Sequence, residues 1–351
     1  MKGKKILVQI LLITLLALTF TGCGGDSETT DATGARGPTY QFRLSTMTSD
    51  VHTLTMSAQR YADAVYEATN GDIEITVYPS NQLGDSATVY DELMMGSIDL
   101  AWQTIPDKYD RKANAGMTPY ITMNWDDVRK LYCDQELWFF KTLKEVNATQ
   151  GVTLLGIVPN GFMGIGAKSV GDVNTIFDLS KKQNALIRSA SIDSLIAQVE
   201  TFGFRVTTIP YADLYSALQT GVADGWYGGS LISNDVGFKD VISCFVEYRA
   251  VNEALGMLMS TKVLETLPAE YQELLVQLAT EENLIAMDEV QARENEAKTS
   301  LENYGVTIIT PTDEELQSIA KAVRASVYPL FEKDFGKDLM DDINTWVEAL
   351  D

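Results

Sequence analysis

The chain has 351 residues, 45% of them hydrophobic and 22% charged, a composition typical of a globular protein long enough for two domains. Its formal net charge is −22, and it becomes −25 if the lysines at positions 2, 4 and 5 are removed with an export signal. Such an acidic surface disfavours nucleic acid and anionic lipid as partners.

The N-terminus has the pattern of a bacterial export signal. Lysines precede an apolar run at 6–20 that is too short to span a bilayer comfortably, although an uncleaved anchor helix is the alternative. The letters FTGC (20–23) resemble a lipobox, with Phe20 in place of the usual Leu. We therefore expect a lipoprotein signal peptide at 1–22, a lipid on Cys23 that anchors the exported chain to the cell membrane, facing the periplasm or the extracellular side, and a flexible tether at 23–39.

Short apolar strands alternate with amphipathic helices through the rest of the chain. Strand patterns occupy 41–47, 73–79 and 98–104, with helical patterns at 51–71 and 86–95 between them. This β-α-β-α-β order predicts a parallel sheet covered by helices. The later predicted elements are a helix from Trp125 to about Val146, strands at 152–159, 185–191 and 204–210, a very long helix from Pro268 to about Tyr304, a strand at 306–311, a capping box at 312–315 and two closing helical stretches.

Two segments, 76–104 and 207–230, share one order of features. Each has a β-branched strand ending in Pro, a helix with Tyr and Leu, then Gly, two residues, Asp and a strand carrying aromatics. The matched positions are Gly96 with Gly221, Asp99 with Asp224, and Trp102 with Tyr227. The echo is either convergent α/β patterning or the sign of two similar half-domains that face each other around a cleft.

Arg188 lies inside the otherwise neutral strand ALIRSAS (185–191). An arginine flanked by Leu186, Ile187 and Ala190 cannot be a solvated charge on both faces of a strand. Its planar fork suits bidentate capture of a carboxylate. An internal salt bridge with one of the chain's many acids is the alternative.

Trp102, Trp226 and Tyr227 lie in or just after strands of the two repeated segments. The carboxyl ends of parallel strands are where open α/β sheets bind ligands. Core packing is the alternative for each aromatic. For Trp226 and Tyr227 the cleft is favoured, because the glycines at 225, 228 and 229 supply no packing partners.

Motifs for catalysis, cofactors or metals are missing from the sequence. The glycine-rich stretch 160–169 lacks P-loop spacing, and there is no G-x-S-x-G elbow. The single His52 cannot build a zinc site. We therefore expect no enzyme activity, no cofactor and no metal. Cys133 and Cys244 are either a disulfide or two buried thiols.

Four segments resemble the substrate-binding proteins of tripartite ATP-independent periplasmic (TRAP) transporters, the DctP-like group. The resemblance covers about residues 41–350. The segments are NGDIEITVYPSNQLGDSATVYDELMMGSIDLAW (70–102), ALIRSAS (185–191), IPYADLYSALQTGVADG (209–225), which is the most specific, and LPAEYQELLVQLATEE (267–282).

The resemblance implies an α/β, two-domain periplasmic-binding-protein-like fold with hinge strands, a ligand cleft between the domains and a long helix crossing both. Domain I would comprise 40–159 and 248–290, and domain II would comprise 160–247 and 291–351. It also implies a monomer without catalytic activity that delivers its ligand to the membrane subunits of a TRAP permease.

Site residues follow from the same resemblance. Arg188 falls on the family's ligand-carboxylate arginine. The family usually has an acid or an amide at the position of Trp226, Glu at the position of Tyr227, and Asn at the position of Gly228. Where the family often has a second arginine, this chain has Phe162 and Met163, and Lys168 is near enough in sequence to supply part of the missing charge.

These departures favour a monocarboxylate with an apolar or aromatic body over a sialic-acid-like or small dicarboxylate ligand. Arg188 would pair the carboxylate, and Trp102, Trp226, Tyr227 and Phe162 would pack the body. A ligand-sensing protein that presents its closed form to a receptor kinase is the alternative function.

Overall fold

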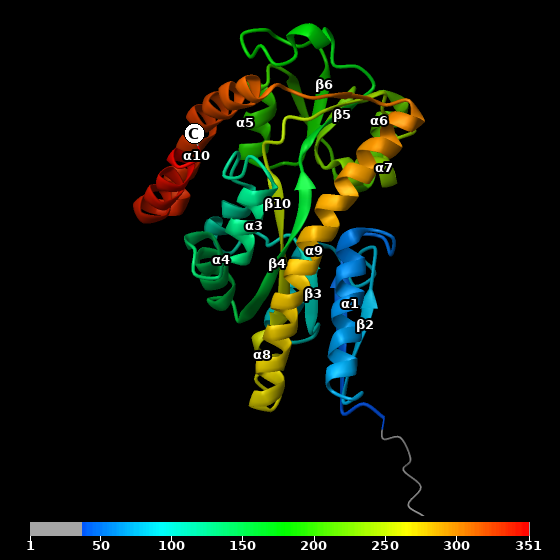
Figure 1. Cartoon of the computed structure of the whole chain (residues 1–351), viewed down its shortest axis with the longest axis vertical. Coiled ribbons are helices and arrows are strands. Elements are labelled where there is room, and N and C mark those ends of the chain that lie inside the picture. The colour runs from blue at the N-terminus through cyan, green and yellow to red at the C-terminus, as the bar shows by residue number, and fades with distance from the viewer. Residues whose placement is uncertain (1–36, 351) are drawn as a thin grey trace, which may run out of the picture. The chain divides into compact units, whose positions relative to one another are not determined.

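Two β-sheets with helices packed on them make up residues 37–350, the part of the chain described by the computed structural model (Figure 1). The predicted α/β class is confirmed. The expected signal peptide, the lipid attachment at Cys23 and the tether up to residue 36 lie outside the described residues. No helix within 37–350 is both long and apolar enough to cross a membrane.

The first sheet has the strand order β2-β1-β3-β10-β4. Strands β1, β2 and β3 run parallel, as the β-α-β-α-β pattern predicts, and β10 is antiparallel to both of its neighbours. The bounds are β1 (Tyr40–Thr46), α1 (Thr53–Ala68), β2 (Ile73–Tyr78), α2 (Ser86–Met95), β3 (Leu100–Gln103), a 3₁₀ helix (Arg111–Met117), α3 (Trp125–Cys133), α4 (Trp138–Ala148), β4 (Val152–Phe162) and β10 (Asn252–Ser260).

The second sheet has the strand order β11-β9-β5-β8-β6-β7. Its centre is β8, which is parallel to β6 and antiparallel to β5. The bounds are β5 (Gly164–Ala167), a 3₁₀ helix (Val173–Thr175), β6 (Leu186–Ser189), α5 (Asp193–Thr201), β7 (Arg205–Thr208), α6 (Tyr211–Thr220), β8 (Gly225–Gly229), α7 (Leu231–Gly237), β9 (Cys244–Val246) and β11 (Thr307–Ile309).

The chain passes between the sheets where β4 continues through Met163 into β5, and again where β9 leads through 247–251 into β10 (Figure 1). A third link is α9 (Ala269–Tyr304), which follows the short α8 (Thr261–Leu264) and packs against β4 and α1 as well as α7 and β11. The predicted helix along both sheets is therefore present. Its buried Glu294 accepts a hydrogen bond from the backbone N–H of Phe162 at 3.0 Å, and burial raises the pKa of this carboxyl to about 8. The domain boundaries given above stay a prediction.

The helix predicted from Trp125 to about Val146 is two helices, α3 and α4. The backbone adopts an extended conformation at Asp134 (φ −85°, ψ 100°), and the next helix begins after Leu137. The break lets Tyr132 and Phe139 stack with their ring centroids 5.1 Å apart, both fully buried. Burial of two aromatic faces outweighs the helical pattern of the connecting residues.

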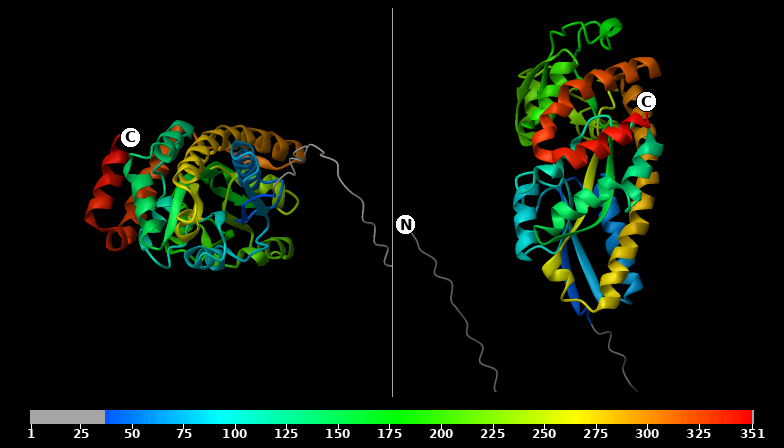
Figure 2. Two further views of the ribbon diagram at one scale, coloured as in Figure 1. Left: turned by 90° about the horizontal axis from the view of Figure 1, so that it is seen from below. Right: turned by 90° about the vertical axis from the view of Figure 1, so that its left-hand side faces the viewer.

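The last helix, α10 (Asp313–Glu348), begins at the predicted capping box, in which Thr312 and Glu315 bond each other's backbone N–H. Gly336 interrupts it with φ 74° and ψ 171°, so the two predicted closing stretches are present and can be followed in Figure 2. This helix packs against α5 and the 3₁₀ helix Arg111–Met117. Cys133 and Cys244 are free thiols, so the disulfide alternative is wrong.

The sequence echo corresponds to a repeated local structure. Gly96 and Gly221 both end a helix in the left-handed conformation, with φ of 81° and 77°. Three residues later, the carboxylate of Asp99 accepts the N–H of Arg43 at 2.7 Å, and that of Asp224 accepts the N–H of Leu186 at 2.7 Å. In both copies the acid receives an N–H from a neighbouring strand that runs parallel to the strand beside the acid. The two segments are therefore similar half-structures in different sheets.

Candidate functional site

A cavity of about 590 Å³ is lined by residues of both sheets. One wall comes from the loop between β1 and α1, which includes the N-cap of α1, from the residue after β3, and from strands β4 and β10. The other comes from β6, the loop that follows it, α5, α6, β8 and α7. The polar lining residues used below are His52, Thr104, Asn160, Arg188, Tyr211 and Glu253.

Arg188 is fixed on strand β6 with its side chain in the cavity wall. Its register pairs it with Trp226 on β8, so the two side chains leave the same face of the sheet. Its Nε donates to the carbonyl of Ile209 at 2.8 Å, and the residue is only 5% exposed. Burial lowers the pKa of this guanidinium. Within residues 37–350 Arg188 forms no ion pair, so the internal salt bridge considered above is not found there.

Trp226 lines the cavity, but its surroundings differ from the expectation. The indole packs on Phe238 at a centroid distance of 4.7 Å, and its Nε1 donates to Asn234 Oδ1 at 3.0 Å. A Cβ on Gly229 would overlap the six-membered ring of Trp226. Gly229 therefore packs against Trp226 because it lacks a side chain, and the expectation that the glycines supply no packing partner is wrong for Trp226.

Tyr227, Gly228 and Met163 also line the cavity. Because side chains alternate along a strand, Tyr227 leaves the sheet on the face opposite to Trp226. Its hydroxyl donates to Gln198 Oε1 at 2.6 Å, and its ring meets Phe202 edge-on at 5.7 Å. Gly228 has φ +126°, a conformation that other residues rarely adopt.

The structure does not bring Trp102, Phe162 or Lys168 into the cavity lining. Trp102 is fully buried on the α1 face of the first sheet, 5.1 Å from the ring of Tyr61. The guanidinium carbon of Arg249 lies over the ring of Phe162, 4.8 Å from the centroid of that ring.

The expectation that Lys168 lies near the ligand is wrong because of the direction of its strand. Strand β5 runs antiparallel to β8, so its first residue lies beside the end of β8 and its last, Ala167, beside the start. Lys168 therefore emerges at the sheet end away from the cavity, where Nζ donates to the exposed carbonyl of Gln219 at 3.1 Å. From this position Lys168 cannot supply the charge of the missing second arginine.

Glu253 is a cavity residue that the sequence reasoning missed. It lies on β10 and is 8% exposed, and its two carboxyl oxygens accept hydrogen bonds from Thr104 Oγ1 at 2.9 Å and Asn160 Nδ2 at 2.8 Å. Burial raises the pKa of this carboxyl. The signal was available, because an acid inside the apolar run VNEALGML (251–258) is as anomalous as Arg188 in ALIRSAS.

His52 caps helix α1 at the cavity wall. Its Nδ1 accepts the N–H of Leu54 at 3.2 Å. Burial, followed by the nearby Arg293 charge, lowers the pKa of His52 from 6.5 to about 4, so the imidazole is neutral at pH 7. It adds no positive charge to the cavity.

Replacing His52 with asparagine should make the protein less sensitive to acid. A lowered folded-state pKa means that stability from neutral His52 is present above pH 6.5 and is lost as the pH falls towards about 4. Asparagine keeps a side-chain cap and does not titrate. Thermal unfolding between pH 7 and pH 4 should show a shallower decline for the variant, whereas parallel curves would contradict this assignment.

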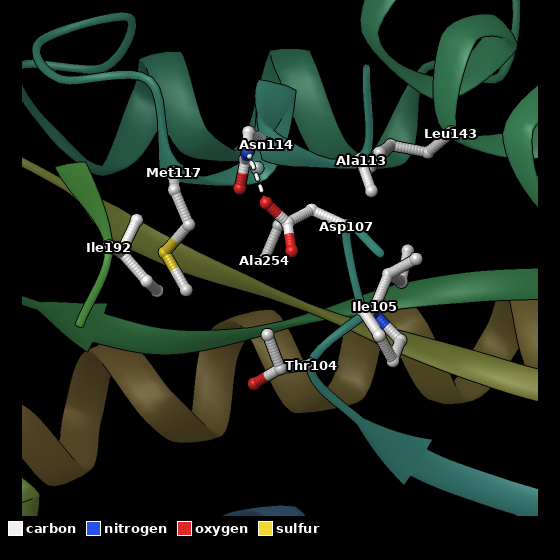
Figure 3. Close-up of a pocket in the computed structure, with 11 residues that line it drawn as sticks. Thr104, Ile105, Asp107, Ala113, Asn114, Met117, Leu143, Ile192 and Ala254 are labelled. Atoms are coloured by element: carbon white, nitrogen blue, oxygen red, sulfur yellow. Dashed lines mark hydrogen bonds between the residues drawn. The ribbon is translucent and has the colours of Figure 1, made fainter. Parts of the chain in front are cut away.

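A smaller cavity of about 110 Å³ adjoins the first, and Thr104, Met117 and Ile192 line both. Figure 3 shows that its wall is mainly apolar, from Ile105, Ala113, Leu143 and Ala254, with one hydrogen bond from Asn114 to Asp107 at 2.9 Å. The site thus combines one buried guanidinium, one buried carboxyl and apolar surface that extends beyond the main cavity.

The family model, the similar sequences and the similar structures all point to one family of proteins. Residues 44–334 match the model of the bacterial extracellular solute-binding proteins, family 7. The C4-dicarboxylate-binding periplasmic protein of Vibrio cholerae is 24% identical, over 84% of this chain and 86% of that protein. The ectoine/5-hydroxyectoine-binding periplasmic protein of Ruegeria pomeroyi is 24% identical, over 85% and 86%. A TRAP periplasmic solute-binding protein of Desulfovibrio salexigens with bound orotic acid superposes with a TM-score of 0.77 at 20% identity, over 88% of this chain and 98% of that one.

Proposed function

The chain belongs to family 7 of the bacterial extracellular solute-binding proteins, the DctP family, and we propose that it captures a small organic acid with Arg188. The observation that carries this proposal is a buried arginine, without an acidic partner among residues 37–350, in the wall of a cavity of about 590 Å³. A buried unpaired charge is costly, and a ligand carboxylate relieves that cost through two parallel hydrogen bonds.

The ligand body is proposed to be apolar or aromatic. Trp226, Tyr227 and Met163 line the same cavity as Arg188, and the adjoining apolar cavity offers further room. Stacking on an aromatic ring contributes roughly 0.5–1.5 kcal/mol per pair beyond area burial. The relatives differ in what they bind, so the ligand of this chain is inferred from its own cavity lining.

Capture is proposed to serve transport. Closure of the two sheets about the crossovers at Met163 and 247–251 would enclose the ligand, and a TRAP permease would recognise the closed form. The protein would act as an exported monomer without catalysis, held by lipid on Cys23 at the outer face of the cell membrane.

A thermal-shift screen of organic acids tests the proposal. Monocarboxylates with apolar or aromatic bodies should raise the melting temperature, because a ligand at a hundred times its Kd adds about 2.7 kcal/mol to folding stability. Stabilisation only by polyhydroxylated acids or dicarboxylates would overturn the proposed ligand class.

A further inference from the structure

Two residues of opposite charge, neither with an ionic partner in the described part of the chain, line one cavity. Arg188 is one, and Glu253, on the other wall, is the second. Glu253 forms no ion pair with any Lys, Arg or His among residues 37–350. Leaving either charge buried and unpaired costs free energy, so each wall favours a ligand group of the opposite charge.

Burial raises the pKa of Glu253, whereas its hydrogen bonds with Asn160 and Thr104 lower that pKa and so favour the ionised form. The Asn160 amide turns its Nδ2 to one carboxyl oxygen, and the Thr104 hydroxyl reaches the other. Each oxygen accepts one hydrogen bond, and a carboxylate can accept about four in all. Capacity therefore remains for donors from a ligand.

The remaining titratable groups of the cavity do not neutralise Glu253. His52 is neutral at pH 7, and the Tyr227 hydroxyl is bonded to Gln198. Tyr211 is influenced by both charges: after burial, which raises its pKa, Arg188 lowers that pKa and Glu253 raises it. Arg188 and Glu253 thus act on the same phenol.

We propose that the ligand is a zwitterion, whose carboxylate pairs with Arg188 and whose protonated amine pairs with Glu253. This inference rests on the proposed function and narrows it from monocarboxylates to amino acids in the broad sense. A hydroxyl in place of the amine would donate one hydrogen bond and leave the Glu253 charge uncompensated. The apolar surface between the two walls fits the ligand's carbon skeleton.

Sets of three matched ligands test the inference on the full-length protein. Isothermal titration compares an amino acid with its hydroxy and its deaminated analogue: phenylalanine, phenyllactate and 3-phenylpropionate, then 4-aminobutyrate, 4-hydroxybutyrate and butyrate. In at least one triple the amino member should bind roughly tenfold tighter or better, as expected for a desolvated charge pair. Equal or tighter binding of the hydroxy or deaminated members in every triple that binds would overturn the inference.

Glu253→Gln, which keeps the size of the side chain, should remove the preference for the amine while the deaminated acid still binds. Asp213→Asn, an exposed acid on α6 outside the cavity lining, is the matched control and should keep the preference. Retention of the preference in folded Glu253→Gln would also overturn the inference. If deaminated acids bind through Arg188 without any amine preference, the proposed function stands and only the inference fails. If no acid in any triple binds, both fail.

Discussion

Arg188→Ala is expected to abolish measurable capture of the organic acid. Truncating one partner of a buried, hydrogen-bonded charge pair costs about 2–5 kcal/mol, or roughly thirty- to several thousand-fold in affinity. The loss should be in binding rather than in folding, because within residues 37–350 the Arg188 side chain donates only one hydrogen bond, from Nε to the Ile209 carbonyl. Isothermal titration with the best acid from the thermal-shift screen measures it.

Arg205→Ala is the matched control. Arg205 lies on the neighbouring strand β7 and is exposed, and in the described part of the chain its guanidinium bonds only the Asn184 carbonyl. Removing it takes away the same charge from the same sheet and should leave the Kd unchanged. Equal losses in the two variants would indicate a general electrostatic effect, and unchanged affinity in Arg188→Ala would remove Arg188 from the binding site.

Gly229→Ala is expected to destabilise the protein and disturb the cavity wall. The backbone at Gly229 does not have positive φ, so alanine is unstrained there, but its Cβ would overlap the ring of Trp226. Overpacking of this kind costs roughly 1–3 kcal/mol. Thermal unfolding should show the loss, and ligand affinity should fall because Trp226 lines the cavity.

Gly237→Ala provides the comparison, since Gly237 also lines the cavity, has no positive φ and has open space around an added Cβ. It should leave stability nearly unchanged. A second check combines Gly229→Ala with Trp226→Phe, which shortens the overlapping ring. The double variant should cost less than the sum of the single changes. Additive costs would show that the clash is not the cause.

Much of the fold can be predicted because it depends on local signals. Pro268 and Gly305 bound the long helix α9, and a glycine with positive φ ends α2 where the pattern stops. The break between α3 and α4 could not be predicted this way. It depends on the stacking of Tyr132 on Phe139, a tertiary contact that sequence periodicity does not encode.

The cavity residues also differ in whether a local sequence signal or the tertiary structure determines their position. Arg188 and Glu253 are both charged residues in apolar strands, and this local anomaly predicted the first and could have predicted the second. Lys168 lies close to Phe162 in sequence, but its position depends on the direction of β5. Trp102 and Tyr227 hold equivalent places in the repeat, yet only Tyr227 lines the cavity, because α1 covers Trp102.

Native mass spectrometry of the freshly purified protein, beside Arg188→Ala, tests the central claim most directly. We expect the wild-type protein to retain a small molecule that carries a carboxylate, and the folded variant to have lost it. A retained molecule without a carboxylate, or the same carboxylate held equally by both proteins, would contradict capture of an organic acid by Arg188.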